Sequence, residues 1–248
     1  MISCKIIDLG LAKYLDVLHL QEELLNKNIE AKLSGAPTSN SVILCEHEPV
    51  FTLGKSGKRE NILVSDAEMN AEFYHVNRGG DVTFHGPGQL VVYPILDLDT
   101  LHIGLAQYIF LLEETIIESL KEYGLKGVRI EGAAGIWLRR NSEIRNTKYE
   151  MNTELSASTS DFGLRTSDSK IGAIGVKASR NVTMHGIAIN VNTDLTYFSK
   201  IVPCGLEGKG TTSLQKELGK EISMNDYKKI FVTTFEKVFS TRARSAEY

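Results

Sequence analysis

The sequence contains few cysteines and no long apolar segment. Its 248 residues include only three cysteines, Cys4, Cys45 and Cys204, an odd and sparse set that cannot build a disulfide framework. Such usage fits a reducing compartment. No apolar segment approaches the roughly 18 residues of a membrane span, and the first residues lack the basic and apolar regions of a signal peptide. We therefore expect a cytoplasmic protein without a membrane partner.

Other absences remove further classes of function. The formal net charge is −3, so the surface as a whole lacks the positive excess typical of nucleic-acid-binding proteins. The six histidines and three cysteines show no metal-ligand spacing such as Cys-x-x-Cys or His-Glu-x-x-His. In the glycine-rich segment 205–211, Gly210 stands where a phosphate-binding loop needs Ser or Thr. We predict no nucleic-acid partner, no metal and no cofactor.

Strand and helix patterns alternate along the chain. A hydrophobic content of 42% and a charged content of 24% suit one globular domain, residues 1–248, with a sizeable core. Apolar periodicity predicts helices at 11–31, 104–123 and 225–239. Short apolar segments predict strands at 4–8, 41–45, 50–53, 73–77, 90–95, 128–131, 136–138, 171–176 and 187–191. This order is too irregular for strict parallel repeats, so we predict an α/β fold with a mixed sheet flanked by helices.

One segment interrupts the pattern. Residues 140–169 are rich in Asn, Ser, Thr and charged residues and poor in apolar ones. Such a composition predicts a long surface excursion or a partly disordered loop. We interpret it as a polar insertion in the domain.

The densest group of glycines and polar side chains lies between two predicted strands. It reads Arg78-Gly79-Gly80-Asp81-Val82-Thr83-Phe84-His85-Gly86-Pro87-Gly88-Gln89. Glycines let a ligand approach the backbone, and consecutive N–H groups can bind an oxyanion. Arg78 could hold an anion, and His85 could exchange a proton near neutral pH. A hairpin-like connection fits the spacing equally well, but the density of polar side chains favours a binding site.

Two further segments begin with a polar residue and continue as an apolar strand. Lys170 precedes a strand that contains Ala173-Ile174-Gly175, and a solvated lysine at a strand edge is the ordinary interpretation of this pattern. His185 precedes Gly186-Ile187-Ala188, where a structural histidine and a functional one fit the pattern about equally.

The three cysteines have different surroundings. Cys4 and Cys45 lie within apolar strand patterns, so we expect them to be buried and inert. Cys204 stands between Pro203, which keeps the preceding residue extended, and Gly205, which permits a sharp turn. This sequence predicts a thiol presented at a loop tip.

Together these motifs resemble the signature of the lipoyl(octanoyl) transferases, the LipB family. The resemblance runs in family order through residues 46–54, 78–94, 170–176, 185–190, 194–195, 203–205 and 212–214. It implies an acyltransferase with the catalytic fold of biotin and lipoate protein ligases. It further implies that Cys204 forms an acyl thioester, that Lys170 lowers the pKa of Cys204, and that residues 78–85, 173–175 and 186–188 line the acyl site. The insertion at 140–169 is a departure, because many family members connect more briefly there.

The resemblance also implies the substrates. The donor would be octanoyl-acyl carrier protein, and the acceptor a lysine of a lipoyl domain or of the glycine cleavage H protein. A thiol attacks as thiolate, which a nearby ammonium favours, and a cysteine thioester keeps the energy of the donor thioester, so no ATP is needed. Since both protein partners would be acidic, we expect a local basic cluster at the site. The candidates are Lys55, Lys58, Arg59, Lys177 and Arg180.

Two other functions remain open at this stage. One is an ATP-dependent lipoate or biotin protein ligase on the same fold, and the other is a non-catalytic acyl-binding protein. Neither needs a reactive cysteine. The presence of both Cys204 and Lys170 therefore favours the transferase.

Overall fold

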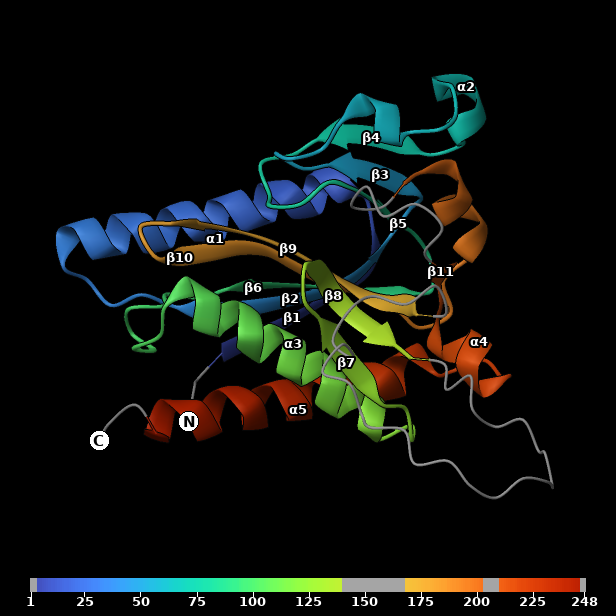
Figure 1. Ribbon diagram of the computed structural model, residues 1–248. Coiled ribbons are helices and arrows are strands. Elements are labelled where there is room, and N and C mark those ends of the chain that lie inside the picture. Colours follow the sequence, from blue (N-terminus) through green and yellow to red (C-terminus); the bar gives the residue numbers. More distant parts are fainter. Residues whose placement is uncertain (1–3, 140–167, 203–209, 246–248) are drawn as a thin grey trace, which may run out of the picture.

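The computed structural model describes residues 4–139, 168–202 and 210–245, which form two β-sheets and their covering helices (Figure 1). The large sheet has eight strands, in the order β1-β2-β6-β10-β9-β8-β7, with β11 paired to β9. Its strands are β1 (Cys4–Ala12), β2 (Asn40–His47), β6 (Gln89–Ile95), β7 (Gly127–Ile130), β8 (Ala133–Leu138), β9 (Ser169–Ser179), β10 (Val182–Asn190) and β11 (Gly210–Thr211). The β1–β2 and β9–β11 pairs are parallel and the others antiparallel, which confirms the predicted mixed sheet.

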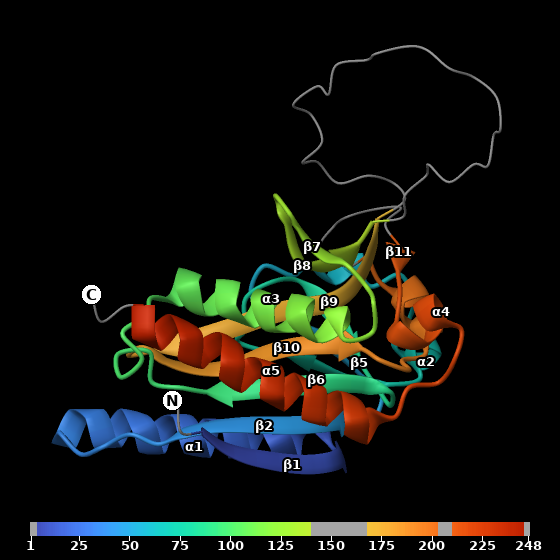
Figure 2. The ribbon, with the colours of Figure 1, turned by 90° about the horizontal axis from the view of Figure 1, so that it is seen from below.

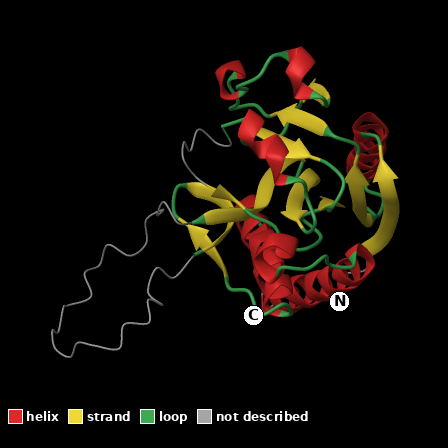
Figure 3. Cartoon of the chain, turned by 90° about the vertical axis from the view of Figure 1, so that its right-hand side faces the viewer, coloured by secondary structure: helices red, strands yellow, loops and turns green. Residues whose placement is uncertain are grey.

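A smaller sheet packs against the large one. It has three strands in the order β4-β3-β5. These are β3 (Val50–Leu53), β4 (Glu72–His75) and β5 (Val82–His85), accompanied by the short helices η1 (Arg59–Asn61) and α2 (Asp66–Met69). Its ring contacts reach helix α1, where Tyr14 stacks on Tyr74 with 5.7 Å between ring centroids. The small sheet therefore lies on the same side of the large sheet as α1 (Figures 1 and 3).

Helices cover both faces of the large sheet. Figures 1 and 2 show α1 (Tyr14–Ser34) on one side, and α3 (Leu105–Lys121) and α5 (Met224–Ser245) on the other. The remaining helical segments are η2 (Leu195–Lys200) and α4 (Leu214–Leu218). Strand side chains alternate between the two layers: Val42 and Leu44 pack with α3 and α5, whereas Ile43 and Cys45 pack with α1. Because both faces are buried, the central strands read as continuous apolar segments.

The structure corrects several boundaries predicted from the sequence. The first helix starts at Tyr14 rather than at residue 11, because Leu11 and Ala12 continue strand β1. Residues 82–85, predicted as loop, form β5 and pair with β3. Asp168 and Ser169, assigned to the polar insertion, are buried, and Ser169 begins β9. The rest of that insertion, 140–167, lies outside the described residues. Within the described ranges, no helix has both the length and the apolarity needed to cross a bilayer.

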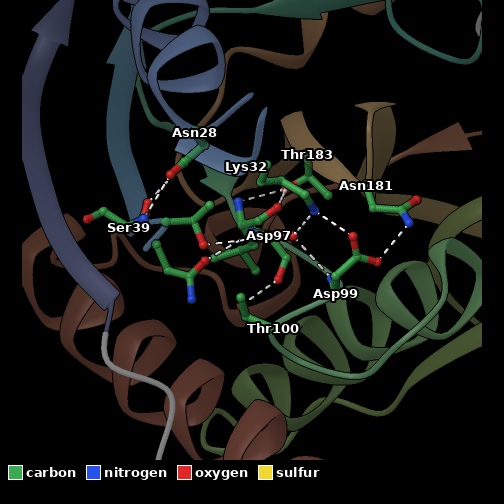
Figure 4. A network of polar contacts seen from close by, with 11 residues as sticks. Asn28, Lys32, Ser39, Asp97, Asp99, Thr100, Asn181 and Thr183 are labelled. Atoms are coloured by element: carbon green, nitrogen blue, oxygen red, sulfur yellow. Dashed lines mark hydrogen bonds and ion pairs between the residues drawn. The ribbon is translucent and has the colours of Figure 1, made fainter. Parts of the chain in front are cut away.

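A polar network anchors the C-terminal end of α1 (Figure 4). The Lys32 ammonium lies 2.5 Å from a carboxylate oxygen of Asp97 and 2.5 Å from one of Asp99. Asp97, with a side chain only 3% exposed, also accepts a hydrogen bond from Thr38 at 3.0 Å. Asn181 donates to Asp99 at 2.8 Å. The network thus joins α1, the segment after β6 and the β9–β10 turn.

We expect Lys32→Met to lower the free energy of unfolding by about 2 kcal/mol, because it leaves the buried Asp97 carboxylate without its cation. Urea unfolding at pH 7 measures this. The matched control on the same helix is Lys27→Met. Lys27 pairs with Glu23 at the surface, where both side chains are more than half exposed, so its loss should cost less than about 0.5 kcal/mol. If both variants lost the same unfolding free energy, the network of Lys32 would stabilise the protein no more than an ordinary surface ion pair does.

Candidate active site

A pocket lies between the two sheets. It encloses about 810 Å³, its open mouth included, and its walls come from both sheets, from Tyr14 of α1 and from Phe198 of η2. The predicted catalytic residue Lys170 lines it, as do most of the residues predicted for the acyl site: Arg78, Gly80, Asp81, Val82, Thr83, His85, Ala173, Ile174, Gly175, Gly186, Ile187 and Ala188. Segments far apart in the sequence are therefore brought to one cavity.

Two predicted residues do not line this pocket. The Phe84 ring is 1% exposed and stacks on Tyr197 in the core of the small sheet, with 4.2 Å between centroids. Gly79 instead donates its N–H to the Val176 carbonyl at 3.0 Å. The predicted Cys204 lies outside the described residues.

Other pocket residues were not assigned to the acyl site from the sequence, although His185 was considered as a possible functional residue. They are Tyr14, Gln89, Val91, Tyr93, Ala134, Gly172, His185, Asn190, Phe198 and Thr211. Gln89, Tyr93, His185 and Asn190 lie within segments that carry the family resemblance, so their place in those motifs was the available signal. Nothing around Tyr14 in the sequence distinguishes it from an ordinary helix residue.

Glycines bring the pocket walls together at two places. A Cβ atom on Gly186 would lie 2.1 Å from the Val92 carbonyl oxygen, so only glycine lets β10 approach β6 so closely there. A Cβ atom on Gly175 would lie 3.0 Å from both the Arg78 side chain and the Gly79 carbonyl oxygen. Glycine at this position lets the segment that begins at Arg78 lie directly on β9.

Arg78 holds this segment in place. Its guanidinium, in a residue that is 8% exposed, donates to the Thr52 carbonyl at 2.8 Å and to the Thr52 hydroxyl at 2.9 Å. It also donates to the Gly79 and Asp81 carbonyls, each at 2.9 Å. Arg78 was predicted as a possible anion-binding residue, and the structure shows it tying its own loop to β3.

A chain of hydrogen bonds connects His85 to Lys170. The Gln89 amide donates to a main-chain carbonyl at 3.1 Å and to Asn190 Oδ1 at 2.9 Å. Its oxygen must therefore face His85 Nδ1, 2.7 Å away, which carries the proton and donates it. Asn190 donates to the Thr212 carbonyl at 3.0 Å, and the Thr212 N–H donates to the Lys170 carbonyl at 2.9 Å. The loop of His85 and the strand of Lys170 are thus held in one fixed relation.

Histidines at and behind the pocket are neutral at pH 7. Burial lowers the pKa of His85 to about 3, that of His185 to about 3 and that of His47 to about 4, from an ordinary 6.5. His47 donates from Nδ1 to the Ala12 carbonyl at 2.9 Å and accepts at Nε2 from the Tyr93 hydroxyl at 2.8 Å. The expectation that His85 exchanges a proton near neutral pH is therefore wrong.

These three histidines should make stability fall in acid. Above pH 6.5 the rings are neutral in both the folded and unfolded states. Below it the unfolded state binds protons that the folded state excludes, so the unfolding free energy should drop by up to about 4 kcal/mol per pH unit down to about pH 4. Urea unfolding between pH 5 and 7.5 gives this slope. His47→Gln should reduce it by about 1.4 kcal/mol per pH unit; an unchanged slope would mean that His47 titrates normally in the folded protein.

Lys170 is enclosed by neighbouring strands. On one side it pairs with Trp137 of β8, and on the other with Thr211 of β11. The residue is 8% exposed, and its ammonium nitrogen lies 4.9 Å from the centroid of a Trp137 ring. The interpretation of Lys170 as a solvated strand-edge lysine is therefore wrong.

Of the two described cysteines, Cys45 is buried as predicted, whereas Cys4, also predicted to be buried, is only partly so. Cys45 is fully buried and burial raises its thiol pKa. Cys4 is partly buried, and burial raises its pKa to about 12. Both thiols are therefore poor nucleophiles at neutral pH.

Comparison with known proteins identifies the family. Residues 13–236 match the lipoyl protein ligase A/B catalytic domain. An octanoyltransferase of Parabacteroides distasonis is 45% identical over 235 residues, which cover 92% of this chain and 96% of the relative. The octanoyltransferase of Christiangramia forsetii is 41% identical over 247 residues, 96% of each chain.

Solved structures share the fold at low sequence identity. The bipartite lipoate protein ligase of Thermoplasma acidophilum gives a TM-score of 0.63 at 12% identity, covering 97% of this chain and 85% of that one. A lipoate-protein ligase A bound with ATP gives 0.62 at 13% identity, with 96% and 86% covered. Biotin protein ligase from Aquifex aeolicus gives 0.51 at 12% identity, with 97% and 72% covered. The predicted ligase-like fold is confirmed.

The chain belongs to the lipoyl protein ligase A/B catalytic-domain family. Within that family its relatives at 41–45% identity are octanoyltransferases, and the chain is an acyltransferase of the LipB family.

Proposed function

We propose that this protein transfers an octanoyl group from octanoyl-acyl carrier protein to a lysine of lipoyl domains and of the glycine cleavage H protein. The Cys204 thiolate attacks the donor thioester, so a new C–S bond forms at Cys204 as the carrier thiol leaves with a proton. The acceptor amine then attacks this thioester, an amide forms and Cys204 is released. Lys170 favours the thiolate and handles the proton, and the pocket-lining residues within 78–85, 173–175 and 186–188 hold the acyl chain.

One observation carries the proposal: a buried lysine lies at a largely apolar pocket in an octanoyltransferase family fold. Strand β9 bears Lys170 at one point and the pocket residues Ala173 and Gly175 a few positions on. An aliphatic chain in the pocket would leave its reacting carbonyl beside a charged group, as acyl transfer requires.

The described residues on either side of segment 203–209 support a role for Cys204. Val202, two positions before it, donates to the Asn61 carbonyl at 2.8 Å, and the Asn61 amide donates to the pocket residue Asp81 at 2.5 Å. At the other end, Thr211 lines the pocket and pairs with Lys170. Both ends therefore border the site.

The test is an intact-mass measurement after incubation with octanoyl-acyl carrier protein and without ATP. One octanoyl group should be added, hydroxylamine should remove it, and peptide mapping should place it on Cys204. Cys204→Ala should show no adduct. Acylation that requires free octanoate and ATP would instead indicate a ligase, and an unmodified protein that still binds the donor would indicate an acyl-binding protein.

A basic cluster beside the pocket fits the acidic substrate proteins. Lys55 and Lys58 are exposed. The Lys55 N–H donates to the Arg78 carbonyl at 3.0 Å, which places the cluster on the pocket segment. Lys177 follows Val176, whose carbonyl accepts from Gly79. Arg180 was expected to join them but lies at the β9–β10 turn, next to the polar network of Figure 4.

Reversing Lys55 and Lys58 to Glu should raise the KM for octanoyl-acyl carrier protein about tenfold and leave turnover of a small octanoyl thioester nearly unchanged, because the charges attract only the protein donor. The effect should shrink with salt, since exposed charges are screened over roughly 8 Å at physiological ionic strength. The control reverses Lys121 and Lys126, which are exposed on the other side of the large sheet. If reversing Lys121 and Lys126 raised KM equally, the cause would be the net charge of the protein and not the position of the basic cluster.

A further inference from the structure

Trp137 lies beside Lys170 and has no part in the proposed reaction. Trp137 and Lys170 are direct partners on neighbouring antiparallel strands, so their side chains share one face of the sheet. The register shifts by one residue just before Trp137. A bulge of this kind re-aims side chains, and bulges are frequent next to active sites.

The Trp137 ring is held rigidly. The residue is 1% exposed, and its indole N–H donates to the Ala133 carbonyl at 2.9 Å. Its polar atom is therefore satisfied within β8, and the ring face is left for its neighbour. The ammonium nitrogen of Lys170 lies 4.9 Å from the ring centroid, within the range of a cation–π interaction, for which tryptophan is the best aromatic partner.

Gly135, two residues before Trp137 on β8, also borders the lysine stem. Its φ is +108°, and a Cβ atom there would lie 2.4 Å from the Gly172 carbonyl oxygen and 3.4 Å from Lys170 Cε. The backbone at Gly135 and the ring of Trp137 thus bound the path of the lysine side chain, which leaves it little freedom to leave the pocket.

We propose that Trp137 is a positioning residue for Lys170: its indole face holds the side chain at the pocket and so sets how readily Cys204 becomes a thiolate. The effect on Cys204 rests on the proposed function, whereas the contact between Trp137 and Lys170 does not. An aromatic face attracts an ammonium group, so the ring fixes where the end of the Lys170 side chain lies.

The experiment measures Cys204 alkylation by iodoacetamide against pH in the full-length protein, with the site confirmed by mass spectrometry. Trp137→Leu should move the midpoint upward by about one pH unit. Trp137→Phe keeps an aromatic face and should move it by less than half as much. In a Lys170→Met background, Trp137→Leu should cause no further shift, because no ammonium remains for the ring to hold.

A matched core variant separates positioning from stability. Phe235 is 1% exposed and packs in the core that α5 forms with the other face of the large sheet. Phe235→Leu should lower Tm about as much as Trp137→Leu does and leave the alkylation midpoint in place. A shift caused equally by Phe235→Leu, or a Trp137→Leu shift that persists without Lys170, would overturn the inference.

Fluorescence tests the contact without reference to Cys204. Trp137 is the only tryptophan in the sequence. Fluorescence excited at a wavelength that tyrosine does not absorb therefore reports the surroundings of Trp137 alone. Lys170→Met should change the emission, because it removes a charge a few ångströms from the indole; an identical spectrum would overturn the inference. If Lys170→Met changes the emission but leaves the alkylation midpoint in place, the proposed pairing of Lys170 with Cys204 fails, and Trp137 loses its proposed effect on the thiol.

Discussion

Lys170→Met should reduce octanoyl transfer at least about 10³-fold while the protein keeps its fold, because in the proposed mechanism it removes the group that favours the thiolate and handles the proton. Methionine keeps an unbranched stem of similar length between Gly135 and Trp137, so the packing of β8 and β9 should survive. The loss should appear in kcat rather than in KM, since the acyl pocket is unchanged. Steady-state kinetics with octanoyl-acyl carrier protein, together with a thermal unfolding curve, measures both effects.

The matched control is another buried lysine. Lys228 of α5 is 7% exposed and pairs with Asp8 of β1 at 2.8 Å. Lys228→Met should lower the unfolding free energy by about 1–2 kcal/mol, because it breaks a partly buried ion pair, and should leave kcat within a factor of two or so. If Lys170→Met lowered activity no more than Lys228→Met, Lys170 would be a structural residue and the proposed chemistry would be wrong.

Arg78→Met should have the second largest effect, on both activity and stability. It leaves the Thr52 and Asp81 carbonyls without their donor, which should lower the unfolding free energy by about 2–3 kcal/mol. The loop that forms one wall of the pocket would then loosen, so kcat/KM for octanoyl transfer should fall about 100-fold or more. Arg78→Lys should rescue little, because an ammonium cannot reproduce the fork of a guanidinium that serves several acceptors.

Arg129 provides the comparison for this variant. Its guanidinium also contacts several oxygens, of Glu113, Glu114 and the Phe110 carbonyl, but on the α3 side of the sheet and with a side chain 30% exposed. Arg129→Met should cost less than about 1 kcal/mol and leave kcat/KM unchanged. Arg78 is expected to fix its loop to β3. An Arg78→Met protein of normal stability, with weaker binding of an anionic substrate as its only defect, would contradict this role.

The strands and long helices could be predicted from the sequence because their burial is local in origin. Strand β3 was predicted with its observed bounds, Val50–Leu53, and the helix containing Tyr108, Leu112 and Ile116 within two residues at each end. Their apolar side chains recur at the period of the element itself, so one window of sequence contains the signal. Strand β5 has four residues between glycine-rich segments, and its pairing with β3 across the chain decides its structure.

The family was also accessible from the sequence, because its motifs contain the same residue types in the same order. The roles of the individual residues were not. The sequence around Arg78 fits a side chain that binds an anion and one that fixes its own loop equally well. Only the position of Thr52 decides between the two roles. His85 has the composition of a proton-exchanging residue, and only its burial keeps it neutral.

The sequence by itself determined the apolar framework, the set of candidate residues and the family to which they belong, since these depend on residue identity and local spacing. Tertiary structure alone decided that Lys170 is buried. A single lysine at the start of a strand carries no local mark of burial. Its enclosure depends on Trp137, 33 positions earlier, and on β11, about 40 positions later, both placed by strand pairing. Pairing between distant strands sets which side chains share a cavity, so no local stretch of sequence could have shown that Lys170 is buried.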